Sequence, residues 1–171
     1  MTQNGNTKIL VVEDDQSLAE LYAEWLADRY VVETAYSGEE ALEAFDATVD
    51  IVLLDRMMPG LSGGEVLTRL RQYESNCQVV IVSAVTPDFD IVKMGFDAYL
   101  EKPVEADDLE DVISQMLTRA EYNEDLQELF SLIERQSTLE AVMDADTLET
   151  SPRYQALTDQ LTELEDKVER Y

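Results

Sequence analysis

The sequence predicts an α/β fold, in which a doubly wound parallel sheet of five strands is followed by an α-helical extension. Short apolar runs without polar alternation recur along the first 100 residues, as in strands that are buried on both faces of a sheet. Between these runs, apolar residues return at the helical spacings of three and four. Strands and helices that alternate in this way form parallel sheets with helices on both faces. Beyond residue 120, only the helical spacing continues.

Five strands and five helices are expected to alternate in the first part of the chain. The strands are predicted at residues 9–12, 30–35, 50–55, 79–82 and 98–100. The helices are predicted at residues 17–28, around 41–45 and 66–73, at 87–94, and from 105 onward. The fourth of these is a short helix at best, because Gly95 breaks it.

The C-terminal part is predicted to be wholly helical, and the expected domains are residues 1–121 and 122–171. Its first apolar stripe could continue the preceding helix and consists of Tyr122, Leu126, Leu129, Phe130 and Ile133. A break is expected near residues 144–150, after which Ser151 and Pro152 give a strong signal for a new helix start.

The last predicted helix carries a short heptad seam. The seam consists of Tyr154, Leu157, Leu161, Leu164, Val168 and Tyr171. Two arrangements suit such a short seam equally well. One is a helical hairpin that packs on itself or on the main domain, and the other is an intermolecular coiled coil that would form a homodimer.

The chain is strongly acidic, with 38 Asp and Glu against 12 Lys and Arg and a formal net charge of −26. Residues 1–120 carry 24 acidic and 8 basic side chains, and residues 121–171 carry 14 and 4. This charge disfavours nucleic acid and anionic membranes as partners, because both attract positive charge. An even spread of acidic residues along the chain is also typical of proteins from salt-accumulating halophiles. At molar salt the Debye length is about 3 Å, so the repulsion between these residues is screened.

The remaining composition indicates a cytoplasmic protein. Cys77 is the single cysteine, so an intrachain disulfide is excluded and a reducing compartment fits. The sequence has no apolar run of 18 residues and no signal-peptide pattern in residues 1–8, so no membrane partner is expected. The chain contains no histidine, which excludes histidine-based acid–base triads, and any metal should be a hard ion bound by oxygen.

Polar side chains follow four of the five predicted strands. They are Glu13 and Asp14 after the first strand, Asp55 at the end of the third, Ser83 after the fourth and Lys102 after the fifth. Taken alone, Asp55 could simply begin a turn. However, the carboxyl ends of parallel strands lie at one edge of a sheet, where ligands bind, so we expect these groups to meet.

A magnesium site follows from this arrangement. Three carboxylates at one point would repel one another without a cation, and hard oxygen ligands with room for water and phosphate suit magnesium. The ammonium group of Lys102 and the hydroxyl of Ser83 could contact phosphoryl oxygens. An aspartate can also act as a nucleophile toward phosphorus, which would make Asp55 a phosphoacceptor.

Residues 7 to 121 resemble the receiver domain of two-component response regulators, which has a flavodoxin-like (βα)5 fold. The motifs that carry the resemblance are Val-Val-Glu-Asp-Asp at 11–15, Leu-Leu-Asp at 53–55 with Met-Pro-Gly at 58–60, Ser-Ala at 83–84, Tyr99, and Lys-Pro at 102–103. The resemblance implies that Asp55 accepts a phosphoryl group from the phosphohistidine of a sensor histidine kinase. Phosphorylation would then shift a two-state equilibrium that the helical tail transmits.

The resemblance also implies the roles of the other residues at this edge. Asp14 would bind magnesium directly, Glu13 would act through water, and the remaining ligands would be Asp55 and the backbone carbonyl of Met57. Ser83 would turn toward the phosphate, and the rotamer of Tyr99 would follow it. The peptide bond between Lys102 and Pro103 is expected to be cis.

Three positions near the site have separate interpretations. Asp15 is expected to cap the first helix rather than bind metal. Arg56 is expected to face solvent, because it would point away from Asp55 along a strand-like backbone. Only fifteen residues separate Ser83 from Tyr99, which is shorter than in most receivers by about one helical turn. The fourth helix is therefore expected to be truncated, and the usual dimerisation through that face is in doubt.

Residues 122–171 resemble the HalX domain, a small helical module that follows receivers in halophilic archaea. No basic recognition helix is evident there, so DNA binding through the tail is kept only as an alternative function. A second alternative is a magnesium-dependent phosphatase of the haloacid dehalogenase type. That chemistry uses an aspartate two residues after the nucleophile, where this chain has Met57. We therefore interpret the chain as a phosphorylation-switched response regulator rather than a turnover enzyme.

Overall fold

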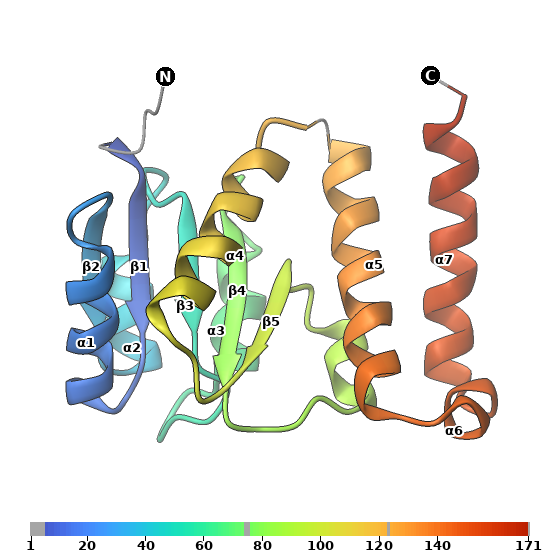
Figure 1. The fold of residues 1–171 in the computed structure, drawn as a ribbon, viewed down its shortest axis with the longest axis horizontal. Helices are drawn as coiled ribbons and strands as arrows, with labels where there is room; N and C mark the ends of the chain where they lie inside the picture. The colour runs from blue at the N-terminus through green and yellow to red at the C-terminus, as the bar shows by residue number, and fades with distance from the viewer. Residues whose placement is uncertain (1–5, 74–75, 123, 171) are drawn as a thin grey trace.

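A computed structural model describes residues 6–73, 76–122 and 124–170. Its centre is a parallel sheet with the strand order β2-β1-β3-β4-β5 (Figure 1). The strands are β1 (Lys8–Val12), β2 (Val31–Ala35), β3 (Ile51–Leu54), β4 (Gln78–Ser83) and β5 (Ala98–Glu101). All five predicted strands are therefore present. The side chains of β3 and β4 are buried throughout, as expected for apolar runs that are covered on both faces.

Helices cover both faces of the sheet. They are α1 (Gln16–Leu26), α2 (Gly38–Ala44), α3 (Gly63–Leu70) and α4 (Ala106–Arg119). Successive strand residues point to opposite faces, so Ile9 and Val11 pack with α1 and α4, whereas Leu10 and Val12 pack with α2 and α3. The doubly wound architecture is confirmed.

The fourth helix of the predicted series is reduced to a 3₁₀ helix, η2 (Phe89–Lys93). The carboxylate of Asp88 caps it by accepting a hydrogen bond of 2.6 Å from the backbone N–H of Phe89. Gly95 follows with a φ of +70°, a conformation that glycine adopts without a steric penalty. The prediction of a truncated fourth helix is confirmed.

Three further helices follow the sheet: α5 (Glu124–Val142), α6 (Ala145–Glu149) and α7 (Pro152–Val168). The first C-terminal stripe does not continue the preceding helix, which the sequence had left possible, because α4 ends at Arg119 and α5 is a separate helix. As Figure 1 shows, α5 instead runs back beside β5. The predicted start of the last helix is confirmed, since the Ser151 hydroxyl accepts a 3.3 Å hydrogen bond from the backbone N–H of Tyr154.

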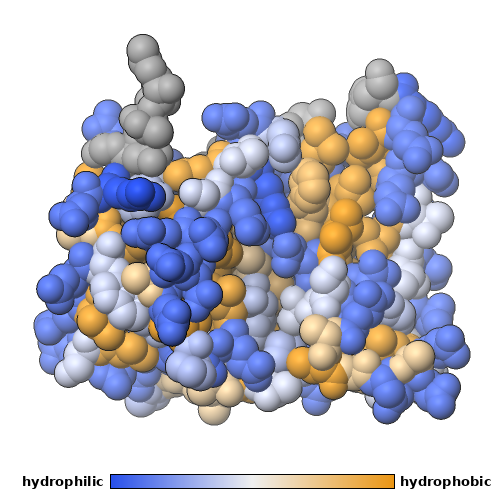
Figure 2. Space-filling model, viewed as in Figure 1, coloured by the Kyte–Doolittle hydropathy of each residue, from blue (hydrophilic) through white to orange (hydrophobic). Residues whose placement is uncertain are grey.

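The C-terminal helices pack against the sheet domain and share its core. We call α5, α6 and α7 together the hairpin. Leu132 on α5 and Leu157 and Leu161 on α7 are buried in the same apolar cluster as Ile91 of η2 and Phe96. Figure 2 shows apolar surface over α5 and where α5 faces α7, together with smaller apolar patches among the hydrophilic surface of the rest of this face. The structure thus has the hairpin arrangement, and the intermolecular coiled coil stays an untested prediction.

Within the described ranges, none of the helices combines the length and the apolar content that crossing a membrane would require.

Candidate functional site

The ends of β1 and β3 bring three carboxylates together. The backbone N–H of Asp55 donates to the Val12 carbonyl at 3.0 Å, which extends the pairing of β3 with β1 by one residue. Oxygens of Glu13, Asp14 and Asp55 consequently lie within 4.8 Å of one another. Glu13 and Asp55 are only 3% and 6% exposed, whereas Asp14 is open to solvent. The expected meeting of these three residues is borne out by the geometry.

Lys102 enters the same cluster from the end of β5. Its backbone N–H donates to the Ser83 carbonyl at 2.8 Å, and the peptide bond to Pro103 is cis, as predicted. The ammonium nitrogen lies 2.5 Å from a Glu13 oxygen and 3.5 Å from a carboxylate oxygen of Asp55. The positive charge of Lys102 therefore partly offsets the negative charges of two largely buried carboxylates.

Burial and charge shift the proton equilibria of this cluster. Burial raises the pKa of Glu13 to about 7, with a further contribution from the charge of Asp55 and an opposing one from the Lys102 hydrogen bond. Burial alone would lower the pKa of Lys102, but the hydrogen bond to Glu13 and the charge of Asp55 raise it overall. The Lys102 ammonium group consequently stays charged at neutral pH, whereas Glu13 binds a proton more readily than a free carboxylate does.

The carboxylates fit a magnesium ion by their chemistry. Magnesium prefers hard oxygen ligands and retains several waters, so it needs only one or two protein carboxylates and an open side. Asp14 is exposed and lies beside the buried pair, which leaves the cluster open to solvent on that side. The backbone N–H of Met57 donates to Asp55 at 3.4 Å, which keeps this backbone close to the cluster.

The side chains of Ser83 and Tyr99 both form hydrogen bonds with the backbone of Val85. The Ser83 hydroxyl is fully buried and accepts a hydrogen bond of 3.1 Å from the backbone N–H of Val85. The Tyr99 hydroxyl donates to the Val85 carbonyl at 2.6 Å. The two residues predicted to switch are thus joined through the backbone N–H and carbonyl of one residue, Val85.

The prediction that Arg56 faces solvent was wrong. Its side chain is only 12% exposed, and its guanidinium group donates to the Tyr99 hydroxyl at 3.3 Å and forms an ion pair with Asp90. The prediction failed because the strand ends at Leu54, so the alternation of side chains no longer applies one residue after Asp55. Asp15 behaves as predicted, since its carboxylate caps α1 by accepting from the backbone N–H of Leu18 at 3.2 Å.

Gly63 supports the site in a way that the sequence did not predict. We call residues 55–62, which connect β3 to α3, the Asp55 loop. The backbone N–H of Gly63 donates to the Arg56 carbonyl at 2.8 Å, and a β-carbon at this position would collide with the backbone of Asp55 and Arg56. The absence of a side chain allows α3 to begin directly against the Asp55 loop. The adjacent glycines at 63 and 64 were the available signal, but their sequence alone did not distinguish between them.

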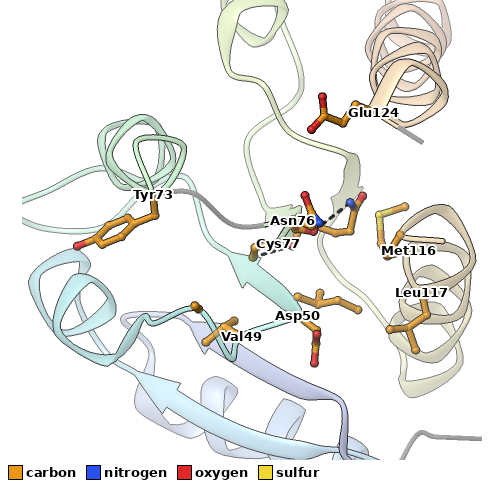
Figure 3. Close-up of a pocket in the computed structure, with 12 residues that line it drawn as sticks. Val49, Asp50, Tyr73, Asn76, Cys77, Met116, Leu117 and Glu124 are labelled. Atoms are coloured by element: carbon orange, nitrogen blue, oxygen red, sulfur yellow. Dashed lines mark hydrogen bonds between the residues drawn. The ribbon is translucent and has the colours of Figure 1, made fainter. Parts of the chain in front are cut away.

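A cavity of about 730 Å³ lies at the opposite end of the sheet. Figure 3 shows Val49 and Asp50 before β3 and Cys77 before β4 on one side, and Met116 and Leu117 of α4 on the other. A carboxylate oxygen of Asp50 already accepts the backbone N–H of Lys8 at 2.9 Å. This cavity therefore lies apart from the carboxylate cluster and adds no group to it.

Comparison with known proteins agrees with this geometry. The family model of the response regulator receiver domain matches residues 9–114, and that of the HalX domain matches residues 118–171. The CheY-like receiver domain protein of Methanospirillum hungatei has 27% sequence identity and a TM-score of 0.62, over 67% of this chain and 96% of that chain. The Thermotoga maritima response regulator TrrA, solved with Mg²⁺ and BeF, has 30% identity and a TM-score of 0.57, over 64% and 98%.

Two curated relatives extend the similarity beyond the receiver. A Haloferax volcanii protein described as a transcriptional regulator is 44% identical over 158 residues, which is 92% of this chain and 26% of that protein. The transcriptional regulatory protein CpxR of Escherichia coli K12 is 34% identical over 83% of this chain and 66% of its own length. The chain thus spans about a quarter of the first relative and about two thirds of the second. The chain belongs to the response regulator receiver domain family, with a HalX domain following the receiver.

Proposed function

We propose that Asp55 accepts a phosphoryl group from the phosphohistidine of a sensor histidine kinase, and that the hairpin transmits the resulting change. The observation that carries this proposal is the cluster of Glu13, Asp14 and Asp55 within 4.8 Å, with the Lys102 ammonium 3.5 Å from Asp55. A nucleophilic carboxylate beside a cation site and a fixed positive charge is the arrangement that phosphoryl transfer requires.

In the proposed reaction, a carboxylate oxygen of Asp55 attacks the phosphorus of the phosphohistidine. The new O–P bond forms as the N–P bond breaks, and the imidazole leaves with the bonding electron pair. In this proposal, the Lys102 ammonium group contacts one phosphoryl oxygen and the Ser83 hydroxyl donates to another. Magnesium would neutralise phosphoryl charge, with Asp14 and Asp55 as direct ligands, Glu13 acting through water and the Met57 carbonyl completing the protein ligands. Hydrolysis of the acyl phosphate would restore Asp55, so the chain would turn over only its own modification.

Intact-mass measurement with acetyl phosphate and magnesium tests this proposal. We expect one added phosphoryl group on the wild-type chain, none on Asp55→Ala, and none after chelation of magnesium. Asp28→Ala is the matched control, because Asp28 is exposed and lies outside the carboxylate cluster. Labelling of the Asp55→Ala variant at the wild-type level would refute the assignment.

Regulation of transcription through DNA binding is a second candidate, supported by the descriptions of the Haloferax volcanii and Escherichia coli relatives. The charge of the C-terminal part opposes it, since residues 121–171 carry 14 acidic and 4 basic side chains. A gel-shift assay in molar potassium chloride separates the two outputs. Retention of a specific DNA fragment by the full chain would favour direct binding, and its absence would favour a protein partner for the hairpin.

A further inference from the structure

The geometry points to a polar relay that links Asp55 to the docking of the hairpin, and we propose that Arg56 is its central residue. The relay rests on the proposed phosphoacceptor role of Asp55. It consists of Ser83, Val85, Tyr99, Arg56 and Asp90, and it ends on the segment of residues 89–96, which we call the docking segment. The proposal assigns a role to the shortened fourth helix of the receiver, namely the surface on which the hairpin is held.

Arg56 connects the Asp55 loop to the docking segment. It follows Asp55 directly in sequence, and its guanidinium group forms an ion pair with Asp90 of η2. The same group donates to the Tyr99 hydroxyl at 3.3 Å. Arg56 is largely buried, whereas the Asp90 side chain is 54% exposed. Arg56 is thus fixed by the protein around it, and η2 is held to it through an accessible carboxylate.

The docking segment connects to the hairpin through both polar and apolar contacts. Arg135 of α5 donates to the Val92 carbonyl at 3.2 Å, and the Ser131 hydroxyl donates to the Phe96 carbonyl at 2.6 Å. Ile91 and Phe96 are fully buried in the cluster that also contains leucines of α5 and α7. Because η2 has contacts with both long helices of the hairpin, a shift of η2 changes the surface on which both rest.

Ser83 supplies the link back to the phosphorylated residue. Its hydroxyl accepts the Val85 N–H, and the Val85 carbonyl accepts the Tyr99 hydroxyl, which in turn accepts from Arg56. If the Ser83 hydroxyl turned toward a phosphoryl group on Asp55, the Val85 N–H would lose its acceptor. The backbone of Val85 could then rotate, and such a rotation would move the Val85 carbonyl that positions Tyr99 and, through Tyr99, Arg56 and Asp90.

The size of the expected effect favours loosening of the hairpin over its release. Coupling between two sites in one protein is typically about 5- to 150-fold in an equilibrium constant. Several buried leucines hold the hairpin in the common core, and together they favour the docked state by a larger factor than this range. Phosphorylation is therefore expected to increase local opening of α5 and α7 while most molecules keep the hairpin docked.

Hydrogen exchange of the full chain in molar potassium chloride tests the relay, with magnesium and beryllium fluoride as the probe of the phosphorylated state. In the wild type, we expect the probe to protect the segment around Asp55 and to speed exchange in α7 by at least about fivefold. In Asp90→Asn without the probe, α7 should already exchange up to about fivefold faster, and the further response to the probe should shrink. Tyr99→Phe should behave similarly, because it removes the hydroxyl at the centre of the relay.

Glu33→Gln is the matched control, since Glu33 lies on β2, at the edge of the sheet far from the hairpin, and its carboxylate forms an ion pair with Lys8 of β1. The relay is refuted if Asp90→Asn exchanges like Glu33→Gln, or if the probe protects Asp55 in the wild type and leaves α7 unchanged. Failure of the proposed function has a different signature, namely no protection near Asp55 and no labelling by acetyl phosphate. Even then, the comparison of Asp90→Asn with the control in the absence of the probe decides whether the ion pair holds the hairpin.

Discussion

At the scale of single residues, the carboxylates of Glu13, Asp14 and Asp55 and the Lys102 ammonium group meet because the strands that carry them end at one edge of the sheet. Buried parallel strands have apolar runs that stop abruptly, so the amino-acid sequence was sufficient to place Glu13, Asp55 and Ser83 at one edge of the sheet. The position of Arg56 could not be derived in this way, because its direction is set by distant partners on η2 and β5. Long-range polar contacts of this kind leave no periodic signal in a sequence.

The two neighbouring glycines at the start of α3 give a sharp test at this scale. Gly63→Ala should lower the free energy of unfolding by about 1–3 kcal/mol, because its β-carbon would meet the backbone of Asp55 and Arg56, which must shift. Gly64→Ala should be neutral or stabilise by up to about 1 kcal/mol, because the nearest atoms to its β-carbon lie 3.9 Å away and alanine favours helix.

Chemical denaturation of both variants in molar potassium chloride checks this difference. Gly64→Ala serves as the control, since it makes the same chemical change one residue further along α3. Equal stabilities of the two variants would contradict the close approach of α3 to the Asp55 loop.

At the scale of elements, periodicity predicted helices well and their connections poorly. The apolar stripe beginning at Tyr122 has the same period whether it extends α4 or forms a new helix, so the sequence could not show that α5 turns back beside β5. The seam on α7 was equally ambiguous, because Leu157 and Leu161 can face either a second chain or η2. Tertiary packing sets the path of α5 beside β5 and buries Leu157 and Leu161 in the shared core.

Shortening one buried leucine side chain of the heptad seam measures how strongly the hairpin is held in the core. Leu157→Ala should lower the free energy of unfolding by about 2–5 kcal/mol, because Leu157 is fully buried in the core shared with the receiver. Gln160→Ala, an exposed position on the same helix, should change it by less than about 0.5 kcal/mol. Denaturation followed by circular dichroism in molar potassium chloride gives both values. A cost of Leu157→Ala as small as that of the control would show that α7 is not packed as described.

At the scale of the whole molecule, the negative net charge is the feature that sets the expected response to salt. With a net charge of −26 on 171 residues, the folded chain concentrates repulsion that the unfolded chain spreads out. Among the described residues, the ion pairs involve a minority of the acidic side chains, so dissolved salt is expected to screen much of the remaining repulsion. The net charge follows directly from the amino-acid composition, whereas the docking of the hairpin could not be predicted from it.

The melting temperature should therefore rise with potassium chloride concentration from dilute buffer to the molar range. The Debye length falls from about 30 Å at 0.01 M to about 3 Å at 1 M, so repulsion between neighbouring carboxylates is progressively screened. Thermal unfolding followed by circular dichroism provides the measurement. Replacing potassium chloride with an uncharged osmolyte of equal osmolarity is the control, and a melting temperature that does not depend on salt would contradict the electrostatic interpretation.

The shared core also sets an order of events during synthesis. Ile91 and Phe96 leave the ribosome well before Leu132, Leu157 and Leu161, the leucines that later cover them. While residues 122–171 are being made, a nascent receiver that has folded ahead of them must carry an uncovered apolar face. A chain that stopped after residue 121 would retain that face permanently, so a nonsense mutation there is expected to yield an aggregation-prone fragment rather than an unregulated receiver.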